Sequence, residues 1–180
     1  MAQDATGPRR RGRPPTVTAE DWAEAALEAI AELGVAGVRV EELARTLGTS
    51  KGSCYWYFPT REDLIAAAFA RWEAGTQEII ARLEALPDPQ QRLRRLRSDA
   101  LAAERSADLE LSLLTTATHP DALAVVRRVT RHRLDFIAAC YRALGHSPEQ
   151  AEQEATSAYA DYLGRAALRR HLPELVPPAG

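Results

Sequence analysis

Residues 48–61 read GTSKGSCYWYFPTR, and this stretch decides the fold. Its first half is a glycine followed by small polar residues around one lysine. Its second half carries four consecutive aromatic residues, Tyr55, Trp56, Tyr57 and Phe58. A core segment would not begin with so many polar groups, and a surface loop would not display so many rings together. A short helix explains both halves, because Ser50 is suited to cap it and Pro59 prevents its continuation.

Two further helices are expected ahead of this one. Thr18 has the properties of an N-cap, with Asp21 as its capping-box partner, and Gly34 ends the helix that follows. A shorter helix carries Val40 to Leu47 and stops at Gly48. Three short helices, the last two joined by a tight turn that contains glycine, are typical of a helix-turn-helix.

The polar start of the third helix is suited to DNA. The first residues of a recognition helix meet base edges in the major groove, where large side chains would hold the backbone away. Small or extended side chains, a glycine that permits close approach, hydroxyls directed at phosphates and positive charges are therefore expected to form the contact surface. The candidate DNA-binding residues are Arg39, Thr49, Ser50, Lys51, Gly52, Ser53, Tyr55, Trp56, Tyr57 and Arg61. Cys54 and Phe58 are expected to face inward.

Residues 1–15 are expected to form a flexible basic arm, because their glycines and prolines prevent a helix. The arm contains RRRGRPP, whose arginines are Arg9, Arg10, Arg11 and Arg13. Its R-G-R-P core is similar to an AT-hook, which lays arginines into narrow A·T-rich minor grooves. A solubilising basic tail is the alternative interpretation. The net charge of the whole chain is −2, which argues against a protein that binds nucleic acid with a basic surface all around. The arm is then the local basic segment that could do so.

The run LGTSKGSCYWYFPTREDLI, residues 47–65, resembles the helix-turn-helix signature of TetR-type transcriptional regulators. The resemblance extends over residues 18 to about 70. Cys54 stands where the family usually has a leucine, and Arg39 lies near the place where the family favours a capping threonine. The resemblance implies double-stranded DNA with a palindromic operator as partner, a homodimer, and a small-molecule effector bound by the rest of the chain.

The remainder of the chain also shows helical periodicity, and no strand alternation is present. Helices are expected over about 60–86, 89–105, 109–118, 121–144 and 148–171. The fold class is therefore all-α, with a basic arm at 1–15, a helix-turn-helix domain at 16–60, and a helical ligand-binding and dimerisation domain at 61–180. The candidate pocket residues are Trp72, Thr115, His119, Cys140 and Tyr141. In the family the last two helices form the dimer interface, for which the candidates are Tyr159, Tyr162, Leu163 and Ala166.

Enzymatic chemistry finds little support. The four histidines and two cysteines show no metal-ligand spacing, and neither a phosphate-binding glycine loop nor a nucleophile elbow is present. We therefore expect no catalytic residues, no metal and no cofactor.

No apolar run is long enough to span a bilayer and no signal segment opens the chain, so a cytoplasmic protein with reduced thiols and no membrane partner is expected.

Together these observations predict a sequence-specific DNA-binding regulator, most often a repressor, that leaves its operator when an effector binds. Two alternatives stay open. One is an architectural binder of A·T-rich DNA that uses the arginine arm. The other is a helical ligand carrier or enzyme with no role on DNA.

Overall fold

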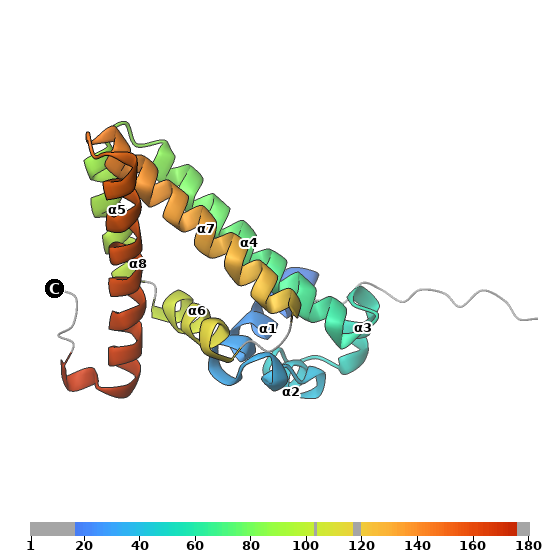
Figure 1. Cartoon of the computed structure of the whole chain (residues 1–180). Helices are drawn as coiled ribbons and strands as arrows, with labels where there is room; N and C mark the ends of the chain where they lie inside the picture. The colour runs from blue at the N-terminus through green and yellow to red at the C-terminus, as the bar shows by residue number, and fades with distance from the viewer. Residues whose placement is uncertain (1–16, 103, 117–119, 176–180) are drawn as a thin grey trace, which may run out of the picture.

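The computed structural model describes residues 17–102, 104–116 and 120–175, and in these ranges the regular structure is entirely helical (Figure 1). The predicted all-α fold is confirmed. The helices are α1 (Ala19–Leu33), η1 (Val35–Gly37), α2 (Val40–Thr46), α3 (Lys51–Tyr57), α4 (Arg61–Glu84), α5 (Pro89–Ala102), α6 (Glu104–Thr116), α7 (Pro120–Ala143), α8 (Pro148–His171) and η2 (Pro173–Leu175).

Helix boundaries follow local signals in the sequence. The Thr18 hydroxyl accepts from the Asp21 amide, and the Asp21 carboxylate accepts from the Thr18 amide, which completes the predicted capping box of α1. Thr60 and Asp63 form the same box at the start of α4. Ser50 occupies the N-cap of α3, but its side chain makes no capping hydrogen bond, so that part of the prediction was wrong.

One boundary differs from expectation. α6 begins at Glu104, ahead of the predicted start at Leu109. No glycine or proline interrupts the chain between these positions, so polar residues continue the helix although they contribute no apolar stripe.

A first core joins the three short helices to the beginning of α4. Trp22 and Ile30 of α1 pack with Leu64 and Phe69 of α4, and all four are buried. The same cluster continues into α6 and α7, where Leu113 is buried. α3 joins this core through Cys54 and packs against α1 and α2.

A second core lies at the other end of the long helices. Ile80 and Leu83 of α4 pack against Phe136 and Ile137 of α7, together with small residues of α8. α4 and α7 lie side by side along their lengths, and α8 diverges from the far end of α7 (Figure 1). Both α4 and α7 therefore belong to both cores.

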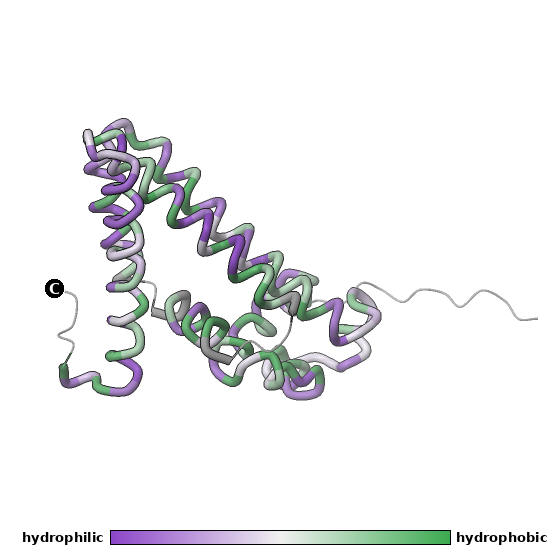
Figure 2. The backbone as a smooth tube through the Cα atoms, in the orientation of Figure 1, coloured by the Kyte–Doolittle hydropathy of each residue, from purple (hydrophilic) through white to green (hydrophobic). Residues whose placement is uncertain are grey.

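Along α4 and α7 hydrophobic and hydrophilic residues alternate at short intervals (Figure 2). This pattern is typical of amphipathic helices that bury one face. Among the described residues, no helix combines the length and the apolar character that crossing a membrane requires.

Candidate functional site

The inner side of α3 is attached to α1. Cys54 is fully buried, as predicted, and burial raises the pKa of its thiol to about 11. Ser53 is also buried, and its Oγ accepts a hydrogen bond from Nε1 of Trp22 at 3.4 Å. The prediction that Ser53 faces DNA was therefore wrong, because the buried indole takes that hydroxyl as its acceptor.

The outer side of α3 is polar at its start and aromatic further along. Ser50, Lys51 and Gly52 are exposed, and Tyr55 and Trp56 each keep 46% of their surface accessible. A methyl group added at Gly52 would approach no heavy atom nearer than the Ser50 Oγ, at 3.6 Å. The exposed residues of α3 thus present one continuous face.

Lys51 of this face has an acidic neighbour, and two more predicted contact residues, Thr49 and Tyr57, border the face. Lys51 Nζ lies 3.6 Å from a carboxylate oxygen of Glu41, and because both side chains are well exposed, this ion pair restrains the lysine little. Thr49 is partly buried in the turn before α3. Tyr57 is partly buried against the first core, with its ring edge-on to Trp56 at 4.6 Å between centroids.

The two predicted arginines of this region differ in environment. Arg39 is exposed and pairs with Glu42 at 3.0 Å. Arg61 donates from Nε to the Val38 carbonyl at 2.7 Å and from Nη2 to the Val35 carbonyl at 2.6 Å. Arg61 therefore holds the loop between α1 and α2 in place, and the structure gives it this role instead of the predicted DNA contact.

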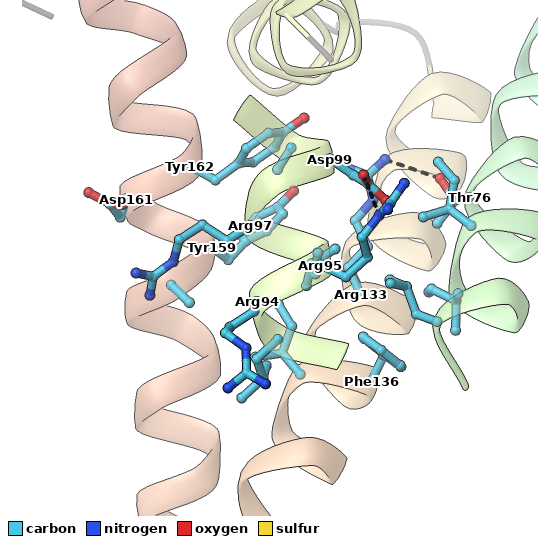
Figure 3. Close-up of a pocket in the computed structure, with 18 of the residues that line it drawn as sticks. Thr76, Arg94, Arg95, Arg97, Asp99, Arg133, Phe136, Tyr159, Asp161 and Tyr162 are labelled. Atoms are coloured by element: carbon cyan, nitrogen blue, oxygen red, sulfur yellow. Dashed lines mark hydrogen bonds and ion pairs between the residues drawn. The ribbon is translucent and has the colours of Figure 1, made fainter. Parts of the chain in front are cut away.

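A second site lies in the other half of the molecule. A pocket of about 1110 Å³ is lined by residues of α4, α5, α7 and α8 (Figure 3). Its apolar part comes mainly from α4 and α7 and includes Ile80, Leu83 and Phe136. Tyr159 and Tyr162 project from α8 into the space between the helices.

The predicted pocket residues differ in their positions. Tyr141 lines the pocket. Trp72 is buried in the first core and Cys140 in the second, where burial raises the pKa of the Cys140 thiol, so their assignment to the pocket was wrong. Thr115 lies in the last turn of α6. His119, like the arm residues Arg9, Arg10, Arg11 and Arg13, falls outside the described residues.

Beside the pocket is a buried polar network that the sequence analysis missed. The Glu110 carboxylate is fully buried and accepts hydrogen bonds from Arg133 and from the Tyr159 hydroxyl. Arg133 also donates through Nη2 to the Thr76 hydroxyl at 3.1 Å (Figure 3). Burial raises the pKa of Glu110, although Arg133 and Tyr159 act in the opposite direction. The available signal was a glutamate inside the apolar run LELSLL, residues 109–114.

The predicted dimer residues differ in exposure. Tyr162 and Leu163 are half-buried, whereas Ala166 is 1% exposed within a single chain. Tyr159 is engaged through its hydroxyl in the network at Glu110. Apolar surface at the end of α8 is instead provided by Leu168, 41% exposed, and by the neighbouring Leu172.

Residues 23–68 match the family model described as bacterial regulatory proteins, tetR family. This segment contains most of α1, all of α2 and α3, and the first turns of α4. Residues 23–68 thus carry the DNA-binding domain of the TetR family. The α2–α3 unit is accordingly the helix-turn-helix of a TetR-family, DNA-binding transcriptional regulator.

Solved TetR-like structures match most of the chain. A transcriptional regulator from Rhodococcus sp. Rha1 is 25% identical with a TM-score of 0.73, over 89% of this chain and 88% of that one. A TetR regulator from Legionella pneumophila has a TM-score of 0.77 at 14% identity, over 88% and 89%. A regulator from Saccharomonospora viridis, solved in complex with choline, has a TM-score of 0.69 at 23% identity, over 83% of each chain.

The described residues offer two features suited to binding, the exposed face of α3 and the pocket between α4, α5, α7 and α8. No group of three or more histidine, cysteine or acidic side chains among them is arranged to hold a metal ion.

Proposed function

We propose that this TetR-family protein is a homodimeric repressor that binds a palindromic operator through the exposed face of α3. A small molecule in the pocket between α4, α5, α7 and α8 releases it from DNA. Residues 16–60 form the DNA-binding domain, residues 61–180 the ligand-binding and dimerisation domain, and residues 1–15 an arm that contacts DNA.

One observation carries this proposal: α4 connects the two sites without a break. It begins at Arg61, directly after α3 and the turn at Pro59–Thr60, and it continues to Glu84. Leu64 and Phe69 fix its first half to the first core, whereas Ile80 and Leu83 line the pocket. A ligand that shifts the second half must therefore act on the support of α3.

The pocket has the size and composition of a small-molecule site. Ligand pockets are typically about 300–1,000 Å³, with a mostly apolar lining and a few polar groups. The volume of about 1110 Å³ is close to the upper end of this range. The choline complex of the Saccharomonospora viridis protein supports a small molecule as occupant of this fold.

A homodimer is supported by the apolar surface of α8. Leu168 and Leu172 are exposed in the single chain, and Tyr162 and Leu163 lie half-buried one or two turns earlier. A two-fold axis through such a surface would bring two copies of α3 to one side of the duplex. Each copy would then read one half-site, about 34–36 Å from the other.

Selection of random duplexes by the full-length protein tests the DNA-binding part. We expect an enriched palindrome, because a two-fold dimer reads the same half-site twice. Lys51→Ala should weaken binding to it by about 1–3 kcal/mol if the lysine reads a base. Arg142→Ala, which removes an exposed positive charge at the far end of α7, is the matched control and should leave the affinity unchanged.

The outcomes separate three cases. A loss at Lys51 that is uniform over all sequences identifies a phosphate contact. Unchanged affinity of the Lys51→Ala variant would reject the proposed surface of α3, and enrichment of A·T-rich duplexes without a palindrome would favour an architectural DNA binder.

A further inference from the structure

The charges that line the pocket are strongly unbalanced. The lining includes seven arginines and two aspartates, although the net charge of the whole chain is −2. Asp99 is paired with Arg95 at 2.8 Å, and Asp161 is paired with Arg165 at 2.9 Å. Both acidic groups are thus neutralised by their own helix neighbours, and positive charge remains in excess.

Arg133 is the member of this group that lies deepest. Its side chain is 16% exposed, it lines the pocket from α7, and its guanidinium lies 5.9 Å from the ring centroid of Trp72. Its Nη1 donates to Glu110 and its Nη2 to Thr76, which holds the guanidinium in one orientation. Figure 3 shows the contact with Thr76. A fixed, nearly desolvated guanidinium is well suited to binding a carboxylate, because its donors are already oriented.

Donors also outnumber acceptors around Arg133. Its Nε has no acceptor among the residues the structure describes. A ligand that brings an acceptor to this donor gains a charge-assisted hydrogen bond.

The shape of the lining indicates what else such a ligand contains. Ile80, Leu83 and Phe136 form an apolar wall next to Arg133, and α8 adds the rings of Tyr159 and Tyr162. An anion without an apolar part would make no use of this wall, whereas a purely apolar ligand would leave the Nε of Arg133 without an acceptor.

We propose that the effector is an amphipathic organic acid, whose anionic group accepts hydrogen bonds from Arg133 and whose apolar body lies against Ile80, Leu83 and Phe136. This inference rests on the proposed function of the pocket as the effector site. A cationic ligand is disfavoured, because the arginines would repel it and the two aspartates are already paired.

Glu110 competes with the effector for Arg133. Its carboxylate is fully buried and shares the guanidinium that the ligand needs. The negative charge of Glu110 also opposes a second anion nearby. Replacing Glu110 by glutamine removes this charge and keeps a side chain that can accept from Tyr159 and Arg133. The affinity for an organic acid should then rise.

Titration calorimetry of the full-length protein without DNA tests the ligand class. Three probes of equal chain length are compared at neutral pH and below their micelle-forming concentrations: octanoate, octan-1-ol and octyltrimethylammonium. Octanoate should bind at least about tenfold more tightly than the other two, because only it forms charge-assisted hydrogen bonds with arginine. Equal affinities, preference for the cation, or no binding of octanoate would overturn the proposal.

Variants then locate the acid group. Arg133→Gln should remove the preference for octanoate over octan-1-ol, whereas Glu110→Gln should strengthen octanoate binding severalfold. Arg128→Gln is the matched control, because Arg128 lies on the same helix but pairs with Glu73 and does not line the pocket. Weaker octanoate binding by a folded Glu110→Gln protein, or an unchanged preference in folded Arg133→Gln, would contradict the proposed position.

The proposed function can fail separately. If octanoate binds at Arg133 but does not change the affinity for the operator, the pocket takes an organic acid and is not the site that releases DNA. If it releases the operator equally well with and without Arg133, the acid acts from another position and this inference is wrong.

Discussion

Gly52 occupies the exposed face of α3 between residues proposed to contact DNA. Its surroundings leave room for a methyl group, since the nearest heavy atom would lie 3.6 Å away. The fold therefore does not require glycine at this position. Close approach of the α3 backbone to a base pair would require it.

Gly52→Ala should separate these two requirements. The substitution should leave the free energy of unfolding unchanged or raise it by up to about 1 kcal/mol, because alanine is the better helix former. DNA affinity should fall, because the methyl group would hold the helix away from the groove. Thermal unfolding and fluorescence anisotropy with the selected operator measure the two effects.

Gly164→Ala is the control for the gain in helix propensity. Gly164 is an exposed glycine of α8 at which an added methyl group would meet nothing within 4 Å. It should gain stability in the same way. Because Gly164 lies beside the proposed dimer surface, its DNA affinity is compared after sedimentation shows that the dimer is unchanged, and it should then equal that of the unmodified protein. Equal DNA affinity of both alanine variants would show that the backbone at Gly52 does not approach the duplex closely.

Single residues also show where prediction from sequence reaches its limit. Cys54 and Phe58 were expected inside because one side of this helix must pack against the first helix, and Cys54 is buried while Phe58 is partly buried. Ser53 was expected outside because it is polar. Its orientation depends on the indole of Trp22, 31 positions away in the chain, which needs an acceptor inside the protein.

At the scale of elements, Arg61 connects the start of α4 to the loop that contains η1. It donates to the carbonyls of Val35 and Val38, at 2.6 and 2.7 Å. The same loop contains Gly37, where an added methyl group would lie 2.3 Å from the Leu33 Cβ. The loop between α1 and α2 is therefore closely packed, and Arg61 of α4 fixes its position.

Arg61→Ala should lower the free energy of unfolding by about 1.5–3 kcal/mol, the range for hydrogen bonds to a charged donor. Arg39→Ala is the matched control, because its exposed ion pair with Glu42 contributes at most about 1 kcal/mol. Urea unfolding of both variants measures the difference. Equal stabilities would show that the two carbonyls are satisfied as well by water.

Helix boundaries were predictable wherever a local signal decides them. Thr18 and Thr60 each have an aspartate three positions later, and both capping boxes form. Ser50 has Ser53 at that distance, which cannot complete such a box, and it makes no capping bond. The start of α6 was predicted too far along the chain. No glycine or proline lies between Glu104 and Leu109, and without such a signal the sequence does not show how far the helix extends.

At the scale of the whole molecule, each core contains one cysteine. Cys54 belongs to the first core and Cys140 to the second, and both are buried. Burial raises the pKa of Cys54 to about 11, so little reactive thiolate exists at neutral pH. Reaction of either thiol therefore requires that its core opens.

Neither cysteine should react with iodoacetamide in the native protein, and both should become reactive at the same urea concentration. The reason is that α4 and α7 contribute to both cores, which couples their unfolding. Mass spectrometry of the labelled peptides measures each site separately, with fully denatured protein as the control. Labelling of one site at clearly lower urea would show that its core opens independently.

The pocket was the part of the molecule least accessible from sequence. Its polar network joins Thr76 to Arg133, 57 positions apart, and Glu110 to Tyr159, 49 positions apart. Such contacts depend on how helices pack, and no periodicity within one helix encodes them. Of the predicted pocket residues whose side chains are described, Tyr141 lines it, because it follows Phe136 and Ile137 along the inner side of α7.

Because α4 is attached to both cores, a movement at one end of this helix affects its other end. Its 24 residues span about 36 Å, and its two halves are clamped in separate apolar clusters. A rigid rod of this length that tilts by about 5° carries one end about 3 Å relative to the other. A displacement of about one side-chain rotation beside Leu83 would therefore change the angle of α4 at Thr60. In a dimer, the changes in the two copies of α4 would add.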